Sequence, residues 1–358
     1  MKLSIIVPVY NMAADGKLEY CIRSLLNQTV EDYEILAVDD ASADNSLEIL
    51  RRLECENSGK LKVLASGVNL RQGGAKNIGI RAAAGEWIGI VDSDDWVSPR
   101  MYEKLLHKAE ETGADVVGCD YSLVYDRGME IGTVIRNNHE NQTGILTDEK
   151  YRRLLLDSGS MVIKIYKREM IVKNQLWYPE HMFYEDNCMS PLWLLHCRHF
   201  ERVPEPLYYY YQHETSTVHT ISPTRCHDRM RAMELLIQKA KAYGFYEKFL
   251  PEFEYRFTEL YFITTLFSCM QGSIKGKYKL AGELKRGILH TFPAFRENAY
   301  YRERMGREEK KLIDLLLRSK PVFFVYYYSL NGYRKIRKTL KNKLKPADKR
   351  ERQTKEHG

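Results

Sequence analysis

The sequence predicts an α/β fold, with a mainly parallel sheet flanked by helices and a helical region toward the C-terminus. Three observations carry this prediction. Strand and helix patterns alternate over about the first 120 residues. Two acidic clusters each follow directly on a predicted strand. From about residue 224 onward, the apolar residues recur at helical spacing.

The predicted strands are short apolar runs rich in Val, Ile and Leu, at 3–9, 34–38, 61–64, 86–91 and 115–119. The predicted helices carry apolar residues three and four positions apart, at 19–28, 46–53, 75–84 and 99–112. Gly85 is the expected C-cap of the third of these helices. Alternating strands and helices imply right-handed crossovers and a parallel sheet, whose ligands bind beyond the carboxyl ends of the strands.

The remaining chain is divided by its pattern. Residues 120–225 mix polar loops with two tyrosine-rich strands. Further helices are predicted at 230–242, 253–270, 280–289 and 307–318. The last residues, 346–358, are polar and charged, and we expect them to be disordered.

The basic character of the chain lies in its tail. The net charge is +7, while residues 331–358 hold 11 Lys and Arg against 3 Asp and Glu, a net of +8. The body is therefore close to neutral, which argues against a nucleic-acid-binding protein, because such a protein carries positive charge on a folded face.

Two further features concern the compartment. The seven cysteines form no C-x-x-C pair and are odd in number, which favours reduced, mostly buried thiols in the cytosol. The apolar stretch 3–9 contains Pro8 and is followed by no cleavage site, so it does not read as a signal peptide. No apolar run approaches the roughly 18 residues that a membrane span needs.

The strongest chemical signal is the quartet Asp92-Ser93-Asp94-Asp95, at the end of a predicted buried strand. Crowded carboxylates raise one another's pKa unless a cation neutralises them. Hard cations such as Mg²⁺ or Mn²⁺ prefer oxygen ligands and often bridge to a diphosphate. In isolation the same residues could form a solvated acidic turn, and the position after a buried strand favours a site.

A second acidic cluster, Asp39-Asp40, follows the second predicted strand. A carboxylate there can accept hydrogen bonds from a ribose hydroxyl or a base N–H. Helix capping by Ser42 or Asp44 is the alternative. Both can hold if Asp44 caps while Asp39 or Asp40 faces the ligand.

Five segments in this order resemble a family 2 glycosyltransferase with the GT-A fold. They are the runs 4–11, 24–29, 38–42 and 69–79 and the quartet 92–95. The resemblance is strong over the first 120 residues and weaker to 225. It implies a glycosyltransferase domain at 1–225, with a nucleotide-sugar half at 1–120 and an acceptor half at 121–225. A helical region at 226–345 and the tail at 346–358 would complete the chain.

The resemblance also implies residue roles. Pro8, Val9 and Tyr10 would line the base pocket with Asp40, or less favourably Asp39. Lys76 would lie near the nucleotide, where the family usually has Arg. Asp92 and Ser93 would contact the ribose or donor sugar, and Asp94 would be the principal metal ligand with Asp95 nearby. Two departures stand out, because Ala41 and Arg71 occupy positions where the family often has Gly.

Further along the chain, Glu185-Asp186 resembles the family's pair that contains the catalytic base, with Asp186 the favoured one. A helix N-terminus would keep that carboxylate charged, although acidic residues are also ordinary at helix starts. His213 would touch the metal or the diphosphate, with a lone surface histidine as the alternative, and His219 is a weaker candidate.

The C-terminal segment 321–328 is aromatic, and the segment 334–338 after it is basic. Such a pair suits the surface of an anionic membrane, although a packed helix with a solvated basic face would look similar. We therefore expect a cytoplasmic protein that can lie on the inner face of the plasma membrane.

The reaction so implied is transfer of a hexosyl group from a UDP-linked donor to a hydroxyl of a saccharide or lipid-linked acceptor, with Mn²⁺ or Mg²⁺ as cofactor and inversion at the sugar. Other interpretations have less support in the sequence. An NAD-dependent oxidoreductase lacks its G-x-G-x-x-G turn after the first strand. A processive polysaccharide synthase would carry membrane spans and Gln-x-x-Arg-Trp. A non-catalytic nucleotide-sugar-binding or membrane-binding module remains the alternative.

Overall fold

The structure, a computed structural model, describes residues 1–125, 132–212, 221–272 and 275–343, and the side chains of 336 and 338–343 are outside that description. The chain forms two compact units, Met1–Lys275 and Gly276–Gly358. This division differs from the predicted boundary at 225/226, which falls inside helix α8 (Pro223–Ala242). The reason is packing, because α8 lies against α7 (Glu185–Leu195) within the first unit.

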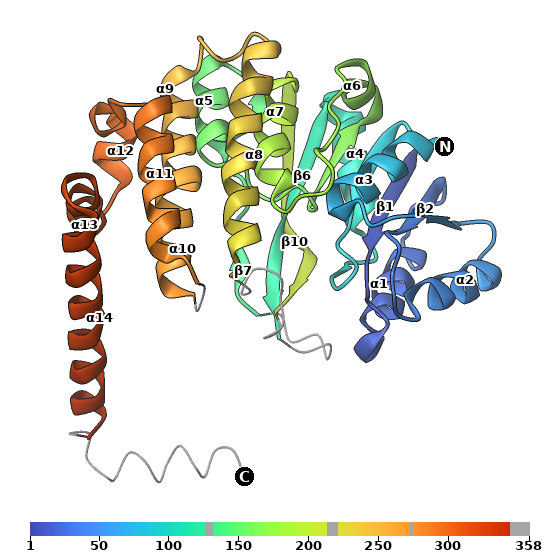
Figure 1. The fold of residues 1–358 in the computed structure, drawn as a ribbon. Helices are drawn as coiled ribbons and strands as arrows, with labels where there is room; N and C mark the ends of the chain where they lie inside the picture. Colours follow the sequence, from blue (N-terminus) through green and yellow to red (C-terminus); the bar gives the residue numbers. More distant parts are fainter. Residues whose placement is uncertain (126–131, 213–220, 273–274, 344–358) are drawn as a thin grey trace. The chain divides into compact units, whose positions relative to one another are not determined.

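The described strands form one sheet in the order β3-β2-β1-β4-β9-β6-β10-β5, with β7 beside β6 and β8 beside β10. Their bounds are β1 Leu3–Val9, β2 Tyr33–Asp39, β3 Leu61–Ala65, β4 Trp87–Ile90, β5 Trp96–Val97, β6 Val116–Val124, β7 Val134–Ile135, β8 Gly144–Ile145, β9 Lys164–Lys167 and β10 His199–Tyr211. Figure 1 shows β1 and β2 in blue and the long β6 and β10 in green.

The half of the sheet nearest the N-terminus is parallel, as the sequence predicts. β1 pairs in parallel with both β2 and β4, and Val9 lies opposite Asp39. β9 runs antiparallel to β4 and β6 and joins the two halves. In the other half, β10 is parallel to β6, whereas the short strands β5, β7 and β8 pair antiparallel. The carboxyl ends of β1, β2 and β4 therefore lie at one edge, where the two acidic clusters begin.

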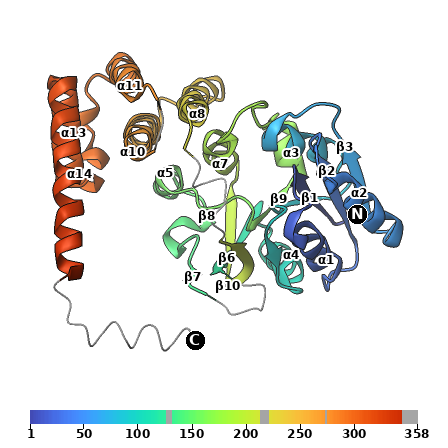
Figure 2. The same cartoon turned by 60° about the horizontal axis from the view of Figure 1, so that its bottom comes forward.

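Helices cover both faces of this sheet (Figure 2). The helices that follow the first strands are α1 Lys17–Leu26, α2 Ser46–Glu56, α3 Arg71–Ala82 and α4 Met101–Thr112. α1, α2 and α4 bury apolar residues in one core cluster with the sheet, in which Ile5, Leu25 and Leu105 are fully buried. α3 packs on β1 so closely that a Cβ at Gly79 would lie 2.5 Å from Cγ2 of Ile6.

Gly85 does not have its predicted role as a C-cap. α3 ends at Ala82, and its C-cap is Ala83, in an extended conformation. Gly85 instead lies against β1, where a Cβ would come within 2.5 Å of the Ser4 nitrogen. The glycine is therefore required by a close backbone approach and not by a helix end. The same helix also begins at Arg71, earlier than predicted.

The later helices of the first unit are α5 Asp148–Leu156, α6 Arg168–Lys173, α7, α8, α9 Leu250–Phe257, the π-helix Thr258–Thr264 and α10 Thr265–Gln271. α9 is fastened to α5 by Arg152, which donates 2.9 Å hydrogen bonds to both carboxylate oxygens of the fully buried Glu252. The helix predicted at 253–270 is therefore present, with a π-helical segment in its middle.

The second unit consists of α11 Lys277–Thr291, α12 Ala299–Arg304, α13 Arg307–Arg318 and α14 Lys320–Lys343. α14 contains the aromatic segment 321–328, whose side chains point to two sides of the helix. Phe323 and Tyr327 are buried in the unit, whereas Val325 and Tyr328 are exposed. Among the described residues, no helix combines the length and the apolar character that a membrane crossing requires.

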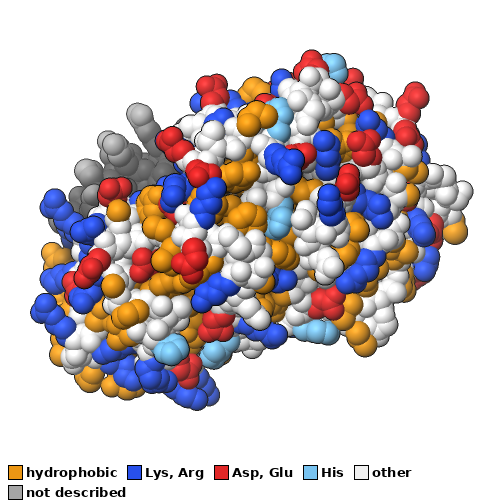
Figure 3. Space-filling model, turned by 90° about the horizontal axis from the view of Figure 1, so that it is seen from above, with side chains coloured by type: hydrophobic (Ala, Val, Ile, Leu, Met, Phe, Trp, Pro, Cys, Tyr) orange, Lys and Arg blue, Asp and Glu red, His pale blue; other side chains and the backbone are white. Residues whose placement is uncertain are grey.

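Two expectations from composition can be compared with the structure. All seven cysteines are free thiols, six of them buried and Cys55 exposed. On the face drawn in Figure 3, Lys and Arg side chains are interspersed with Asp and Glu. That face therefore offers no continuous basic surface of the kind that nucleic acid binding requires.

Candidate active site

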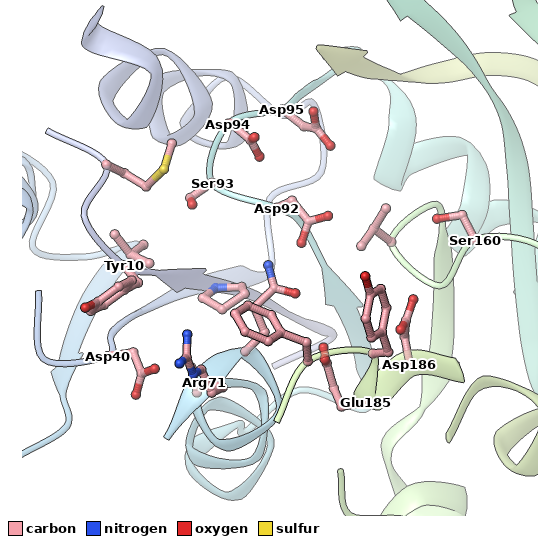
Figure 4. A pocket seen from close by; sticks show the side chains of 18 of the residues that line it. Tyr10, Asp40, Arg71, Asp92, Ser93, Asp94, Asp95, Ser160, Glu185 and Asp186 are labelled. Carbon is pink, nitrogen blue, oxygen red and sulfur yellow. The ribbon is translucent and has the colours of Figure 1, made fainter. Parts of the chain in front are cut away.

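A cavity of about 460 Å³ opens at the edge where the carboxyl ends of β1, β2 and β4 meet. Most of the predicted site residues line it, namely Pro8, Val9, Tyr10, Asp40, Asp92, Ser93, Asp94, Asp95, Glu185 and Asp186. Figure 4 shows Tyr10 and Asp40 on one side of the cavity and Ser160, Glu185 and Asp186 on the other. Asp39 and Lys76 do not line the cavity, and His213 and His219 fall outside the described residues.

The second acidic cluster separates into two environments. The main-chain N–H of Asp40 donates to the Val9 carbonyl, and its Oδ1 accepts from the Leu70 N–H at 2.8 Å. Burial raises the pKa of Asp40. Asp39 turns away, and its Oδ2 accepts from the Ser42 N–H at 3.2 Å. Asp44 accepts from the Ser46 N–H and from the Ala13 N–H, which fixes the loop after β1 to the start of α2.

The quartet forms a tight turn between β4 and β5. Asp95 is 1% exposed, its Oδ2 accepts from the Tyr208 hydroxyl at 2.6 Å, and its Oδ1 accepts from the Tyr211 N–H at 2.9 Å. Asp92 lies closer to the middle of the cavity, and its Oδ1 is buried without a hydrogen-bond partner. Burial is the largest cause that raises the pKa of Asp92, to about 6, and the Asp94 carboxylate adds to it.

The buried, unpartnered oxygen of Asp92 is the feature that fits a cation here. In the part of the chain that the structure describes, no three His, Cys, Asp or Glu side chains converge as metal ligands. Mg²⁺ commonly takes only one or two carboxylates and completes its shell with water and substrate phosphates. The donor set therefore suits a cation that arrives with a diphosphate better than a cage made of protein alone.

Lys76 and Glu185 form a buried ion pair beneath the cavity, with Lys76 Nζ 2.8 Å from Glu185 Oε1. Burial alone would lower the pKa of Lys76, but the carboxylates of Glu185, Asp92 and Asp186 outweigh it and raise the pKa. α3 can approach this closely because Gly73 faces the chain before α7, where a Cβ would lie 2.3 Å from the Pro179 carbonyl oxygen.

Asp186 is in the first turn of α7, and its side chain reaches the cavity. Its Oδ1 accepts from the Asn187 N–H at 2.8 Å. Desolvation of the Asp186 carboxylate by the surrounding groups raises its pKa, and the neighbouring Glu185 carboxylate raises it further. A raised pKa makes a carboxylate a better proton acceptor near neutral pH.

Three residues around the cavity adopt left-handed backbone conformations that favour glycine. Ala41 has φ of 57°, Arg71 of 66° and Tyr184 of 62°. The first two are the positions where the sequence departs from the family's usual Gly. Such strain costs on the order of 1–3 kcal/mol per residue and gathers at functional sites. Tyr184 directly precedes Glu185, so its conformation sets where α7 begins.

The structure adds cavity-lining residues that the sequence does not single out, including Tyr121, Ser160, Phe183, Tyr208, Tyr210 and Arg225. The tyrosine-rich strand is visible in the sequence, and alternation predicts that Tyr208 and Tyr210 share one face of it. Only the pairing of β10 with β6 and β5 shows that this face looks toward the quartet.

Residues 4–173 match glycosyl transferase family 2. The chain is 32% identical over 219 residues to the uncharacterized glycosyltransferase YibD of Escherichia coli (strain K12), across 60% of this chain and 62% of that protein. It is 33% identical over 225 residues to the uncharacterized glycosyltransferase EpsJ of Bacillus subtilis (strain 168), with the same shares. The alignments thus span about three-fifths of these relatives.

Among solved structures, S. aureus TarS 1-349 superposes with a TM-score of 0.68 over 94% of this chain and 92% of that one, at 21% identity. A second TarS structure, in complex with UDP-GlcNAc, has a TM-score of 0.55 and covers 86% and 93%. The shared fold confirms the predicted GT-A architecture. In sequence, the match of residues 4–173 is to glycosyl transferase family 2, and in fold the likeness extends over most of the chain.

Proposed function

We propose that this protein is a metal-dependent, inverting glycosyltransferase that moves a sugar from a UDP-linked donor to a hydroxyl of a saccharide or lipid-linked acceptor. One observation carries the proposal. The loop after β1, the loop after β2, the acidic quartet and the first turn of α7 line a single cavity. Each supplies the chemistry that one step of glycosyl transfer needs.

The nucleotide would lie on the side of Pro8, Val9, Tyr10 and Asp40. The Asp40 carboxylate can accept a hydrogen bond from the base, whereas Asp39 does not line the cavity. TarS binds UDP-GlcNAc in a fold that this chain shares, which supports a UDP-linked donor. Lys76 would act indirectly, through Glu185, since it does not reach the cavity.

A divalent cation would be held by Asp94 and Asp92, with Ser93 beside the sugar. When bound, it would neutralise the diphosphate as it leaves. Asp95 would hold the turn in shape, because both of its oxygens already accept hydrogen bonds from β10. The sequence predicted that Asp95 lies near the metal as a further ligand. We propose instead that it supports the turn that carries Asp92 and Asp94.

Asp186 would remove the proton of the acceptor hydroxyl as that oxygen attacks the anomeric carbon. Glu185 would hold the start of α7 in place through Lys76. Attack from the face opposite the leaving diphosphate inverts the anomeric configuration. Because the membrane contact of the C-terminal segment has no part in this chemistry, it remains a separate proposal for a peripheral protein of the cytoplasmic face.

The decisive experiment compares Asp186→Asn with Asp148→Asn in a transfer assay against a panel of UDP-sugars with Mn²⁺ or Mg²⁺. Asp148 is a matched control, since it also lies in the first turn of a helix but outside the cavity. Asp186→Asn should lower transfer by about 10²-fold or more, with UDP affinity nearly unchanged.

Two outcomes would contradict the proposal. Near-normal transfer by Asp186→Asn would exclude it as the base, and full activity in EDTA would exclude the cation. UDP binding without turnover on any donor and acceptor would instead favour a non-catalytic binding module.

A further inference from the structure

A second cavity, of about 230 Å³, adjoins the active-site cavity. Its lining includes Tyr184, Arg225, Cys226, Arg229, Ser268 and Gln271. Tyr184 and Arg225 line both cavities, so the two share a wall. The second cavity is built by α8, α10 and the residue before α7, and α7 and α8 run side by side in Figures 1 and 2.

Arg229 is the polar centre of this cavity. Its guanidinium carbon lies 4.4 Å from the centroid of the Tyr184 ring. It donates to the Tyr184 hydroxyl at 2.9 Å and to Ser268 Oγ at 3.3 Å. Both of these partners are neutral, and within the described residues no carboxylate forms an ion pair with Arg229. A guanidinium has five N–H donors, so its charge and most of its donors remain available for an anion.

Two further guanidinium groups lie on the neighbouring aromatic residue. The Arg71 guanidinium is 4.4 Å from the centroid of the Phe183 ring, and the Arg225 guanidinium is 4.6 Å from it. Cation–π contacts of this kind hold guanidinium groups in place. Arginine side chains therefore pack on the segment before the proposed base.

We propose that Arg229 binds a phosphate group carried by the acceptor. This inference rests on the proposed function, because it places the anion beside the residue that would activate the acceptor hydroxyl. Guanidinium groups match phosphate geometry, and hydroxyls such as those of Tyr184 and Ser268 add neutral donors. The donor diphosphate is a poorer occupant, since the base-binding loops after β1 and β2 contribute nothing to this cavity.

The phosphate could belong to a diphosphate that links a saccharide to a polyprenyl lipid, or to a phosphodiester in a water-soluble glycan. Both present the same anion to Arg229. They differ in what lies beyond it, so a transfer assay with each acceptor type distinguishes them.

Binding of inorganic phosphate tests the site directly. The full chain would be saturated with UDP and Mg²⁺, and phosphate titrated by calorimetry into wild type, Arg229→Gln, Arg229→Lys and Arg231→Gln. Arg231 is the matched control, because it lies on the exposed face of the same helix. We expect Arg229→Gln to weaken phosphate binding at least tenfold, Arg229→Lys to weaken it less, and Arg231→Gln to change it less than twofold.

UDP affinity should stay the same in all four proteins, which separates this test from the proposed function. Failure of wild type to bind UDP would refute the proposed function. Absence of phosphate binding, competition between phosphate and UDP, or equal phosphate affinity in Arg229→Gln would each overturn the phosphate site.

A second readout uses turnover. With either phosphate-bearing acceptor type, Arg229→Gln should raise the acceptor KM at least tenfold while the donor KM holds. With a phosphate-free analogue of the same saccharide, the two proteins should have the same KM. An equal rise for both acceptors would show that Arg229 only supports the structure of the loop.

Discussion

Lys76 Nζ lies 2.8 Å from Glu185 Oε1, and each of the two side chains is only 5% exposed. The pair joins α3 to α7 across 109 residues of sequence. A buried charge without its partner costs far more than the intact pair contributes. The position of the proposed base, Asp186, therefore depends on this ion pair. Of its two members, Glu185 lines the cavity and Lys76 does not.

Glu185→Gln should lower the free energy of unfolding by about 3 kcal/mol, because it leaves Lys76 buried beside fewer carboxylates. Urea denaturation at pH 7 measures this. Glu149→Gln is the control, since it breaks the exposed pair with Arg153 and should cost less than about 0.5 kcal/mol. The double variant Lys76→Met, Glu185→Gln should recover part of the loss. Equal costs for Glu185→Gln and Glu149→Gln would contradict the pairing.

Tyr208→Phe should destabilise the acidic turn. The Tyr208 hydroxyl donates to Asp95 Oδ2 and accepts from the Asp92 N–H, so its removal leaves a buried carboxylate oxygen unsatisfied. The expected loss is about 2–3 kcal/mol in the free energy of unfolding, with weaker UDP binding in the presence of Mg²⁺. Tyr209→Phe is the control on the same strand, because the ring of Tyr209 stacks on Trp96 and stays in place. A Tyr208 variant that behaves like the Tyr209 variant would count against this role.

The Lys76–Glu185 and Tyr208–Asp95 contacts mark the limit of what the sequence could predict. The strands and the acidic quartet were predictable, because an apolar run and a local motif are properties of neighbouring residues. β1 at Leu3–Val9 has the bounds predicted from its apolar run. The Lys76–Glu185 and Tyr208–Asp95 contacts join segments more than a hundred residues apart, and only the order of strands in the sheet brings them together.

The wrong role predicted for Gly85 has a similar origin. Gly85 follows a helical pattern and so was predicted to cap it, but its true constraint is the backbone of β1, which lies on another element. The boundary at 225/226 followed a change in local pattern, while the compact units depend on which helices pack together. Conversely, the positive φ of Ala41 and Arg71 explains physically why glycine is common at those positions in the family.

Donor binding should weaken in acid because of Asp92. Burial raises its pKa from 3.8 to about 6, so the carboxylate is ionised at pH 7.5 and becomes protonated as the pH falls through 6. A protonated carboxyl no longer attracts a cation, and UDP affinity with Mg²⁺ should fall up to about tenfold per pH unit below that value. Calorimetry from pH 5 to 8 measures this, with circular dichroism to confirm folding. Asp92→Asn should bind UDP weakly over the whole pH range. If this variant showed the same dependence of UDP affinity on pH as wild type, the effect would belong to another group.

Lys164 should make the free energy of unfolding depend on pH. It is fully buried on β9, and its Nζ donates to the carbonyls of Ser158 and Ser160, the latter in the wall of the active-site cavity. Burial lowers the pKa of Lys164 from 10.5 to about 7. Between those two values the unfolded chain binds a proton that the folded chain does not. The free energy of unfolding should therefore rise with pH above 7, by at most about 1.4 kcal/mol per unit.

Lys164→Met removes the titrating group, so the stability of wild type relative to this variant should increase by roughly 1 kcal/mol per unit between pH 7 and 9. Urea denaturation at pH 7, 8 and 9 gives the comparison. Lys150→Met is a matched control, since Lys150 also donates to two main-chain carbonyls, those of Thr143 and Ile145, but keeps contact with water. Parallel pH curves for wild type and Lys164→Met would show that Lys164 stays protonated in the fold. A rising difference would show that the cavity wall at Ser160 is held by a neutral amine at neutral pH and above.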